Sequence, residues 1–161
     1  MKNDAFKRST LMIVVLVNTV IFLSLSILHF YWAFGGKVWY DEVLPTSSNG
    51  LNRLNPGRTA GLMVATGLLL LAAITFANGG FFNRYIKRTY FRYGVLMIAV
   101  IFSLRAIGDF KFIGFFKTVR QTRFGMNDTR LFSPLCLLIA VLSIVIFILS
   151  SNKRLHPKGN Q

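Results

Sequence analysis

The sequence predicts an all-α fold, an integral membrane bundle of four helices. Of the 161 residues, 53% are hydrophobic, and the mean hydropathy is +0.53. The apolar residues form a few long blocks rather than amphipathic patterns, which is typical of membrane spans. Lipid requires each span to satisfy its own backbone hydrogen bonds, and the blocks are too long for barrel strands. The segments between them are too short to bury a soluble core, so residues 1–161 are expected to form a single membrane domain.

The first apolar block predicts a helix over residues 10–34. Ser9 or Thr10 is a suitable N-cap, and Gly35 and Gly36 suit a left-handed C-terminal cap. About 25 residues at about 1.5 Å each give roughly 37 Å, which is enough to cross a bilayer. Basic residues precede this block, as in a secretory signal, but the apolar run is longer than the usual one. We therefore expect an uncleaved first span.

Three further blocks complete the predicted bundle. Asn55 and Pro56 begin the second helix as N-cap and first-turn proline, and Ser133 and Pro134 begin the fourth in the same way. The third block is shorter and carries Arg105 near its end. The expected helices cover residues 56–77, 90–107 and 134–151.

The basic residues indicate a membrane location rather than nucleic-acid binding. The formal net charge is +14, which in a soluble protein would favour a nucleic-acid partner. Lys and Arg, however, flank the apolar blocks, where they face anionic headgroups, and no RNP-like, zinc-finger or helix-turn-helix pattern accompanies them. Four spans place both termini on one side, and the dense basic residues of segment 84–92 favour the cytoplasmic side. The expected location is the cell membrane, with the lipid bilayer as partner and no nucleic acid.

Ionisable side chains within spans are costly, so His29 and Arg105 are the first candidates for function. The first and third helices run in the same direction, and both residues lie near the outer ends of their helices. Trp32 shares the helix face of His29, and Asp109 follows Arg105 at the spacing of one helical turn. Together with Asp128 in the adjoining loop, these residues predict an outward-facing pocket for a small or lipid-like molecule with a polar or anionic group.

A purely structural role for the same residues is the alternative. Arg105 would then be neutralised by Asp109 or Asp128. His29 would hydrogen-bond a loop carbonyl, and Trp32 would anchor the chain at the interface. For the whole protein, the corresponding alternatives are a ligand-binding or catalytic membrane protein and a non-catalytic accessory subunit that binds a membrane-protein partner. A transporter acting alone is less favoured, because four short spans leave little room for a midplane site.

The sequence carries no recognisable catalytic motif, and it identifies neither a reaction nor a cofactor. The two histidines are His29 and His156, and no nucleophile elbow, metal-ligand pair or phosphate loop is present. No metal is predicted; a site built from His29, Asp109 and Asp128 is conceivable, but nothing in the sequence fixes the distances between them. Cys136 is the single cysteine, so it excludes an intramolecular disulfide and is expected to pack as a small apolar residue.

Several motifs together resemble one known family. They are HFYWAFGG at residues 29–36, PT at 45–46, RAIGDF at 105–110, Phe124 with NDT at 127–129, and SPLC at 133–136. In this order they resemble the bacterial membrane family catalogued as domain of unknown function 3995, over nearly the whole chain. The sequence departs from the pattern at Phe132, where a tyrosine is expected before the Ser-Pro pair. The resemblance implies a four-helix membrane protein without an established activity, and its motifs include the polar residues of the predicted pocket.

Overall fold

The computed structural model describes residues 2–44, 57–80, 87–109, 113–118 and 122–151, and all structural statements refer to these residues. Their regular secondary structure is entirely helical, so the predicted all-α fold is confirmed. The four long helices are α1 (Lys2–Ala33), α3 (Arg58–Ala77), α4 (Arg88–Ile107) and α6 (Ser133–Leu149). Three short elements lie between them along the chain: α2 (Tyr40–Val43), α5 (Arg123–Asn127) and the π-helix η1 (Asp128–Phe132).

Four helical stretches are long and apolar enough to cross a membrane: Asn3–Ala33, Arg58–Ala77, Arg88–Ile107 and Arg123–Leu149. Each keeps large apolar side chains exposed on its outward face, among them Ile27, Met63, Met97 and Ile148. Exposure of such apolar surfaces to water is unfavourable, whereas lipid tails solvate them. The outer surface of the bundle is therefore suited to contact with lipid.

Helix α1 begins earlier than the sequence predicts. It starts at Lys2, and the Thr10 hydroxyl donates a hydrogen bond to the Phe6 carbonyl at 3.0 Å, inside the helix. The prediction of an N-cap at Ser9 or Thr10 is therefore wrong. No glycine or proline interrupts residues 2–9, and Asp4 in the first turn favours a helix start there.

The predicted glycine cap is confirmed at the end of α1, and a glycine with positive φ also follows the end of α3. Gly35 adopts a φ of +96°, and the Gly36 N–H donates to the Tyr31 carbonyl at 2.9 Å. This bond spans five residues and is the signature of a left-handed C-terminal cap. After α3 ends at Ala77, Gly80 has a φ of +97°. Only glycine adopts these dihedrals without strain, so both helices end where the sequence predicts.

The starts of α3 and α4 agree with the apolar pattern to within a turn. Asn55 and Pro56, predicted to begin the second long helix, lie outside the described residues, and α3 begins at Arg58 after an N-cap at Gly57. Helix α4 begins at Arg88, close to the expected residue 90. The apolar blocks therefore predict both spans, although the cap residues differ.

The predicted fourth helix corresponds to α6, which begins at Ser133 with Pro134 in its first turn, but the helical stretch starts earlier, at Arg123, so Ser133 is not an N-cap. Thr122 is the N-cap: its Oγ1 accepts a hydrogen bond from the Gly125 N–H at 3.0 Å, and α5, η1 and α6 follow without a break. Pro134 has no N–H and removes one helical hydrogen bond. Just before it, the Ser133 N–H bonds to the Asp128 carbonyl five residues back, which makes the wider π turn. The prediction missed this start because α5 and η1 are polar.

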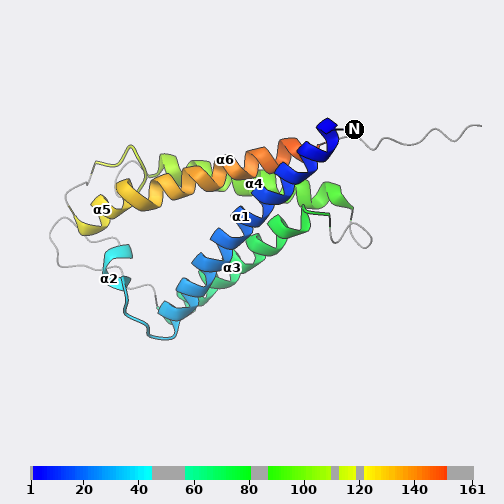
Figure 1. Cartoon of the computed structure of the whole chain (residues 1–161). Coiled ribbons are helices and arrows are strands. Elements are labelled where there is room, and N and C mark those ends of the chain that lie inside the picture. The colour runs from blue at the N-terminus through cyan, green and yellow to red at the C-terminus, as the bar shows by residue number, and fades with distance from the viewer. Residues whose placement is uncertain (1, 45–56, 81–86, 110–112, 119–121, 152–161) are drawn as a thin grey trace, which may run out of the picture.

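The four long helices form two antiparallel pairs (Figure 1). Helix α1 packs along α3, α4 packs along α6, and contacts between α1 and α6 join the pairs. Figure 1 shows the pairs converging near the N-terminus and diverging toward the opposite end, where α2 and α5 lie. We call these the terminal end and the loop end of the bundle. The terminal end holds Lys2, Ala77, Arg88 and Leu149, and the loop end holds Ala33, Arg58, Ile107 and Ser133.

The core lies where the two pairs meet. Its buried apolar residues are Leu11, Val15, Phe22, Ala72, Val95, Ile98, Ile139 and Ile146. Phe22 of α1 and Phe102 of α4 pack edge to face, with ring centroids 5.5 Å apart. Within this core the Asn18 Nδ2 donates to the Ser143 Oγ at 3.2 Å and ties α1 to α6. Such bonds between spans contribute about 0.6 kcal/mol on average, so apolar packing dominates the association of the pairs.

Small residues let α1 and α3 approach closely at the loop end. A Cβ added to Gly61 would lie 3.2 Å from the Ala33 Cβ, which is tighter than ordinary van der Waals contact. Nearby, the Ser26 Oγ donates to the Ala65 carbonyl at 2.8 Å. Gly61 and Ala65 are therefore small because the two helices pack closely within the chain. This packing holds the end of α1 beside the start of α3.

Candidate functional site

A cavity of about 590 Å³ lies at the loop end, surrounded by the C-terminal part of α1, by α2 and by the N-terminal part of α3. Its wall is mostly apolar and includes Phe34, Val43, Leu44 and Val64. Polar or amphipathic side chains on the wall are His29, Trp32, Tyr40 and Arg58. Ligand pockets in proteins typically measure about 300–1,000 Å³ and combine apolar walls with a few polar groups. The cavity has the size and lining of such a pocket.

His29 reaches the cavity wall with one ring nitrogen already engaged. Its Nδ1 lies 2.8 Å from the Leu25 carbonyl oxygen, one turn back in α1. A carbonyl can only accept, so Nδ1 carries a proton, and in the neutral ring Nε2 is then a hydrogen-bond acceptor. If His29 had the purely structural role, its expected partner was a loop carbonyl. The observed partner, Leu25, instead belongs to the same helix. No described residue hydrogen-bonds Nε2, so this nitrogen can contact a ligand.

Trp32 is fixed by both its polar and its aromatic contacts. Its Nε1 donates to the Val38 carbonyl at 2.7 Å, which clamps the turn after α1. Its ring packs edge to face on His29, with centroids 5.0 Å apart, and on Tyr40 at 6.4 Å. With the indole N–H engaged, Trp32 offers an apolar ring surface to the cavity.

Arg58 supplies the cationic group on the cavity wall. It is the first residue of α3, where the helix dipole is positive, and its guanidinium carbon lies 5.3 Å from the centroid of the Phe34 ring. The candidates drawn from the sequence did not include Arg58. In the sequence Arg58 is one of many basic residues beside the apolar blocks. Only the close packing of α1 on α3 brings it beside Phe34.

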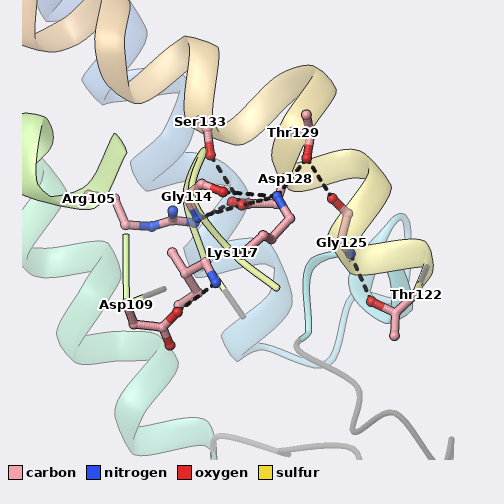
Figure 2. Close-up of polar contacts among 10 residues, drawn as sticks. Arg105, Asp109, Gly114, Lys117, Thr122, Gly125, Asp128, Thr129 and Ser133 are labelled. Carbon is pink, nitrogen blue, oxygen red and sulfur yellow. Dashed lines mark hydrogen bonds and ion pairs between the residues drawn. The ribbon is translucent and has the colours of Figure 1, made fainter. Parts of the chain in front are cut away.

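A second polar cluster at the loop end centres on Asp128 (Figure 2), and the Asp128 side chain is completely buried. Its Oδ1 accepts a hydrogen bond from the Arg105 Nη2 at 2.9 Å. Its Oδ2 accepts from the Lys117 Nζ at 2.8 Å and from the Gly114 N–H at 2.8 Å. The Ser133 hydroxyl also donates to Oδ2, at 3.1 Å. One carboxylate therefore ties the end of α4, the following loop and the start of α6 together.

Lys117 is the buried cation of this cluster, and its side chain is fully shielded. Besides Asp128, its Nζ donates to the Gly114 carbonyl at 3.1 Å and to the Thr129 Oγ1 at 2.6 Å. All three ammonium protons therefore have acceptors, as a buried lysine requires. Sequence reasoning missed Lys117, because a lysine in a polar connection between spans is normally solvated and no spacing rule links it to Asp128.

Two glycines shape the loop that brings these donors to Asp128. Gly108 has a φ of +93° and Gly114 a φ of +90°. A Cβ on Gly108 would overlap the Ile113 carbonyl, and a Cβ on Gly114 would overlap the Ile107 carbonyl. Asp109 closes the same loop, because its Oδ1 accepts a hydrogen bond from the Ile113 N–H at 2.9 Å. The backbone of this loop thus requires glycine at both positions.

The structure divides the five predicted site residues into two groups. His29 and Trp32 line the cavity, whereas Arg105, Asp109 and Asp128 lie in the second cluster and do not line it. The groups are linked through α2, which lines the cavity and contacts α5, the helix that ends just before Asp128. That all five contact one ligand stays a prediction. The sequence left open whether Arg105 pairs with Asp109 or Asp128. In the structure it pairs with Asp128.

The described residues form no metal site of the kind considered from the sequence. No three His, Cys, Asp or Glu side chains among them lie together, so His29, Asp109 and Asp128 do not converge on one point. Cys136 is buried and free, in keeping with the expected packing role.

Four membrane-length apolar helices with lipid-compatible outer faces define a multi-pass integral membrane protein. A family model described as protein of unknown function, DUF3995, matches residues 22–143, and the chain belongs to this family. The resemblance carried by the sequence motifs is thereby confirmed. The matched region begins within α1 and ends within α6, so it includes His29, Arg58 and the Asp128 cluster. No curated protein and no solved structure gave a match.

Proposed function

We propose that this protein binds a small or lipid-like molecule with a polar or anionic group in the cavity at the loop end. One observation carries the proposal: a mostly apolar cavity of about 590 Å³ has both Arg58 and His29 on its wall. Apolar walls give hydrocarbon a place to be buried, and a few polar groups orient the ligand. The cavity is thus suited to an amphiphile rather than to a fully polar solute.

The polar part of the wall favours an anion. Arg58 carries a permanent charge, and its guanidinium can bind a carboxylate or phosphate with two parallel hydrogen bonds. Gly57 precedes α3 as its N-cap residue and has no side chain that could accept a hydrogen bond from the helix. N–H groups of the first turn of α3 therefore remain available beside Arg58. The Nε2 of His29 accepts a hydrogen bond from a hydroxyl when neutral and donates to an anion when protonated.

The Asp128 cluster acts on this site indirectly. The Asp128 oxygens and the Lys117 protons are already engaged, so neither group has capacity left for a ligand. Their role is to hold α5 against α2, one wall of the cavity. In this proposal His29, Trp32 and Arg58 contact the ligand, whereas Arg105, Asp109 and Asp128, which the sequence also assigns to ligand contact, act as positioning residues.

The orientation of the chain completes the proposal. With cytoplasmic termini in a bacterial cell membrane, as the basic residues favour, the loop end faces the outer side. The cavity would then open at the outer headgroup level, because Arg58 and Gly35 lie at the ends of their spans. A molecule of the outer leaflet, or one that arrives from outside, would have direct access.

Native mass spectrometry after purification in a mild detergent tests the proposal. The wild-type protein should retain a bound molecule of defined mass, and Arg58→Gln should lose most of it. Lys37→Gln is the matched control, because Lys37 is an exposed cation at the same end that does not line the cavity. A wild-type protein that carries only the bulk lipids of the membrane in their natural proportions would contradict ligand binding. Such a result together with a stoichiometric partner chain would favour the accessory-subunit alternative.

A further inference from the structure

A second cavity, of about 390 Å³, lies at the terminal end of the bundle, remote from the proposed ligand cavity. It is an open depression lined by the first turns of α1, the glycines after α3, the start of α4 and the end of α6. Its charged lining residues are Asp4, Lys7, Arg8 and Arg88. Three cations against one carboxylate leave this cavity with a positive balance, which attracts an anion.

Arg88 lines this cavity and also carries a buried donor that is unsatisfied. Its Nε is buried and has no hydrogen-bond partner in the described part of the chain. A buried donor without an acceptor is unfavourable, and native proteins rarely leave one unpaired. Arg88 is also the first residue of α4, where the positive end of the helix dipole adds to its charge. An anionic oxygen bound in the cavity would offset the charge of the Arg88 guanidinium and the positive end of the α4 dipole.

The remaining lining identifies the source of that anion. Leu11, Met12 and Leu149 form an apolar part of the same cavity, and the apolar run of α1 begins at Leu11. The basic side chains therefore lie at headgroup level, directly beside the hydrocarbon region. A free phosphate would use only the basic side of the cavity, whereas a phospholipid would use both sides.

We propose that the terminal-end cavity binds the phosphate of an anionic phospholipid, with Lys7, Arg8 and Arg88 around the headgroup and Leu11, Met12 and Leu149 along the first acyl carbons. Basic pockets between spans are known to hold anionic headgroups in this way. The site uses no residue of the loop-end cavity, so it is independent of the ligand-binding function proposed above.

Competition between defined lipids tests this site. The purified protein is mixed with phosphatidylglycerol and phosphatidylcholine in detergent, and the lipids retained are counted by native mass spectrometry. The wild type should prefer phosphatidylglycerol, and Lys7→Gln combined with Arg88→Gln should lose that preference. Lys37→Gln combined with Arg123→Gln removes the same charge from exposed residues at the loop end and should keep it.

Further arms of the experiment keep the outcome decisive. Arg88→Lys keeps the charge at the helix start and should retain part of the preference even if the double variant folds poorly. Inorganic phosphate at millimolar concentration should fail to displace phosphatidylglycerol, because it lacks the apolar contacts. Complete displacement by phosphate would overturn the lipid assignment. An equal loss in the control variant, or no preference in the wild type, would overturn the site itself.

Discussion

The Nζ of Lys117 and the Oδ2 of Asp128 lie 2.8 Å apart, with both side chains fully buried. Lys117 comes from the loop after α4 and Asp128 from the π turn that leads into α6. The ion pair therefore links this loop to the start of the fourth span. Each partner also satisfies its remaining hydrogen-bonding capacity locally. This arrangement ties the described residues 113–118 to the start of the fourth helical stretch.

Removing one partner of this pair should be strongly destabilising. Lys117→Met leaves the Asp128 carboxylate buried without its main counter-charge, and the expected cost is about 3–5 kcal/mol of unfolding free energy. Thermal or denaturant unfolding in detergent measures it, with Arg123→Gln, an exposed cation of the same region, as the control. Adding Asp128→Leu to Lys117→Met should recover part of the loss, because the buried unpaired carboxylate is gone and the Arg105 side chain that loses its partner is 31% exposed. A single Lys117→Met variant as stable as the wild type would contradict the role of the pair.

Arg105→Lys should be tolerated. Only one guanidinium nitrogen, Nη2, bonds Asp128, and the Nη1 of Arg105 is buried without a partner among the described residues. The planar fork of arginine is therefore not used in full, and a lysine of equal charge should change stability by less than about 1 kcal/mol. Unfolding measurements and retention of the bound molecule should both remain near wild type. A large loss of either would indicate that the guanidinium itself contacts a ligand.

Exchanging Arg105 and Asp109 should be clearly destabilising. If these two residues formed an isolated ion pair, reversal would be nearly neutral. Since Arg105 pairs with Asp128 instead, the exchange places a carboxylate beside the buried Asp128 carboxylate. Like charges at this distance repel, and the Asp109 contact to the Ile113 N–H is lost as well. A lower unfolding midpoint than in either single variant is the expected result.

Gly108→Ala should disrupt the cluster without touching any of its charges. Alanine is strained at a φ of +93°, at a cost of about 1–2 kcal/mol, and its Cβ would overlap the Ile113 carbonyl. Gly67→Ala is the matched control, because Gly67 lies inside α3 with open space around the added Cβ. That control should be neutral or stabilise by up to about 1 kcal/mol. Equal effects of the two variants in unfolding experiments would contradict the geometry of the loop.

Both termini should be cytoplasmic. Reporter fusions after Gln161 and within residues 47–49 should report opposite sides of the membrane, because three spans separate these points. The basic segment 84–92 should dominate the orientation through its density of charge. A C-terminal reporter on the outer side would reverse the proposed access to the cavity from outside.

The sequence predicts the spans well because each follows from an uninterrupted apolar block. It also predicts the cap at Gly35, where glycine is the natural residue for a left-handed helix end. The start of the fourth span could not be predicted in this way. The Thr122 cap and the π turn at Asp128 lie in polar sequence, and they form because tertiary contacts satisfy Asp128.

The candidate site was predicted in part. The positions of His29 and Arg105 along their helices correctly place both residues at the loop end. These positions do not show which helices face each other. The divergence of the two helix pairs separates them into two clusters. Lys117 and Arg58 were missed because lysine and arginine in connections are normally solvated, and only the folded chain shows what they contact.

Site-specific photocrosslinking tests the central claim most directly. A photoreactive phenylalanine analogue is placed at Tyr40, which lines the loop-end cavity, or at Tyr31, an exposed residue of the same end that does not. In cells, the Tyr40 position should capture one defined molecule, and adding Arg58→Gln should abolish this product. The Tyr31 position should capture bulk phospholipids whether or not Arg58 is present. Identical product profiles at the two positions, unchanged by Arg58→Gln, would contradict a ligand-binding cavity.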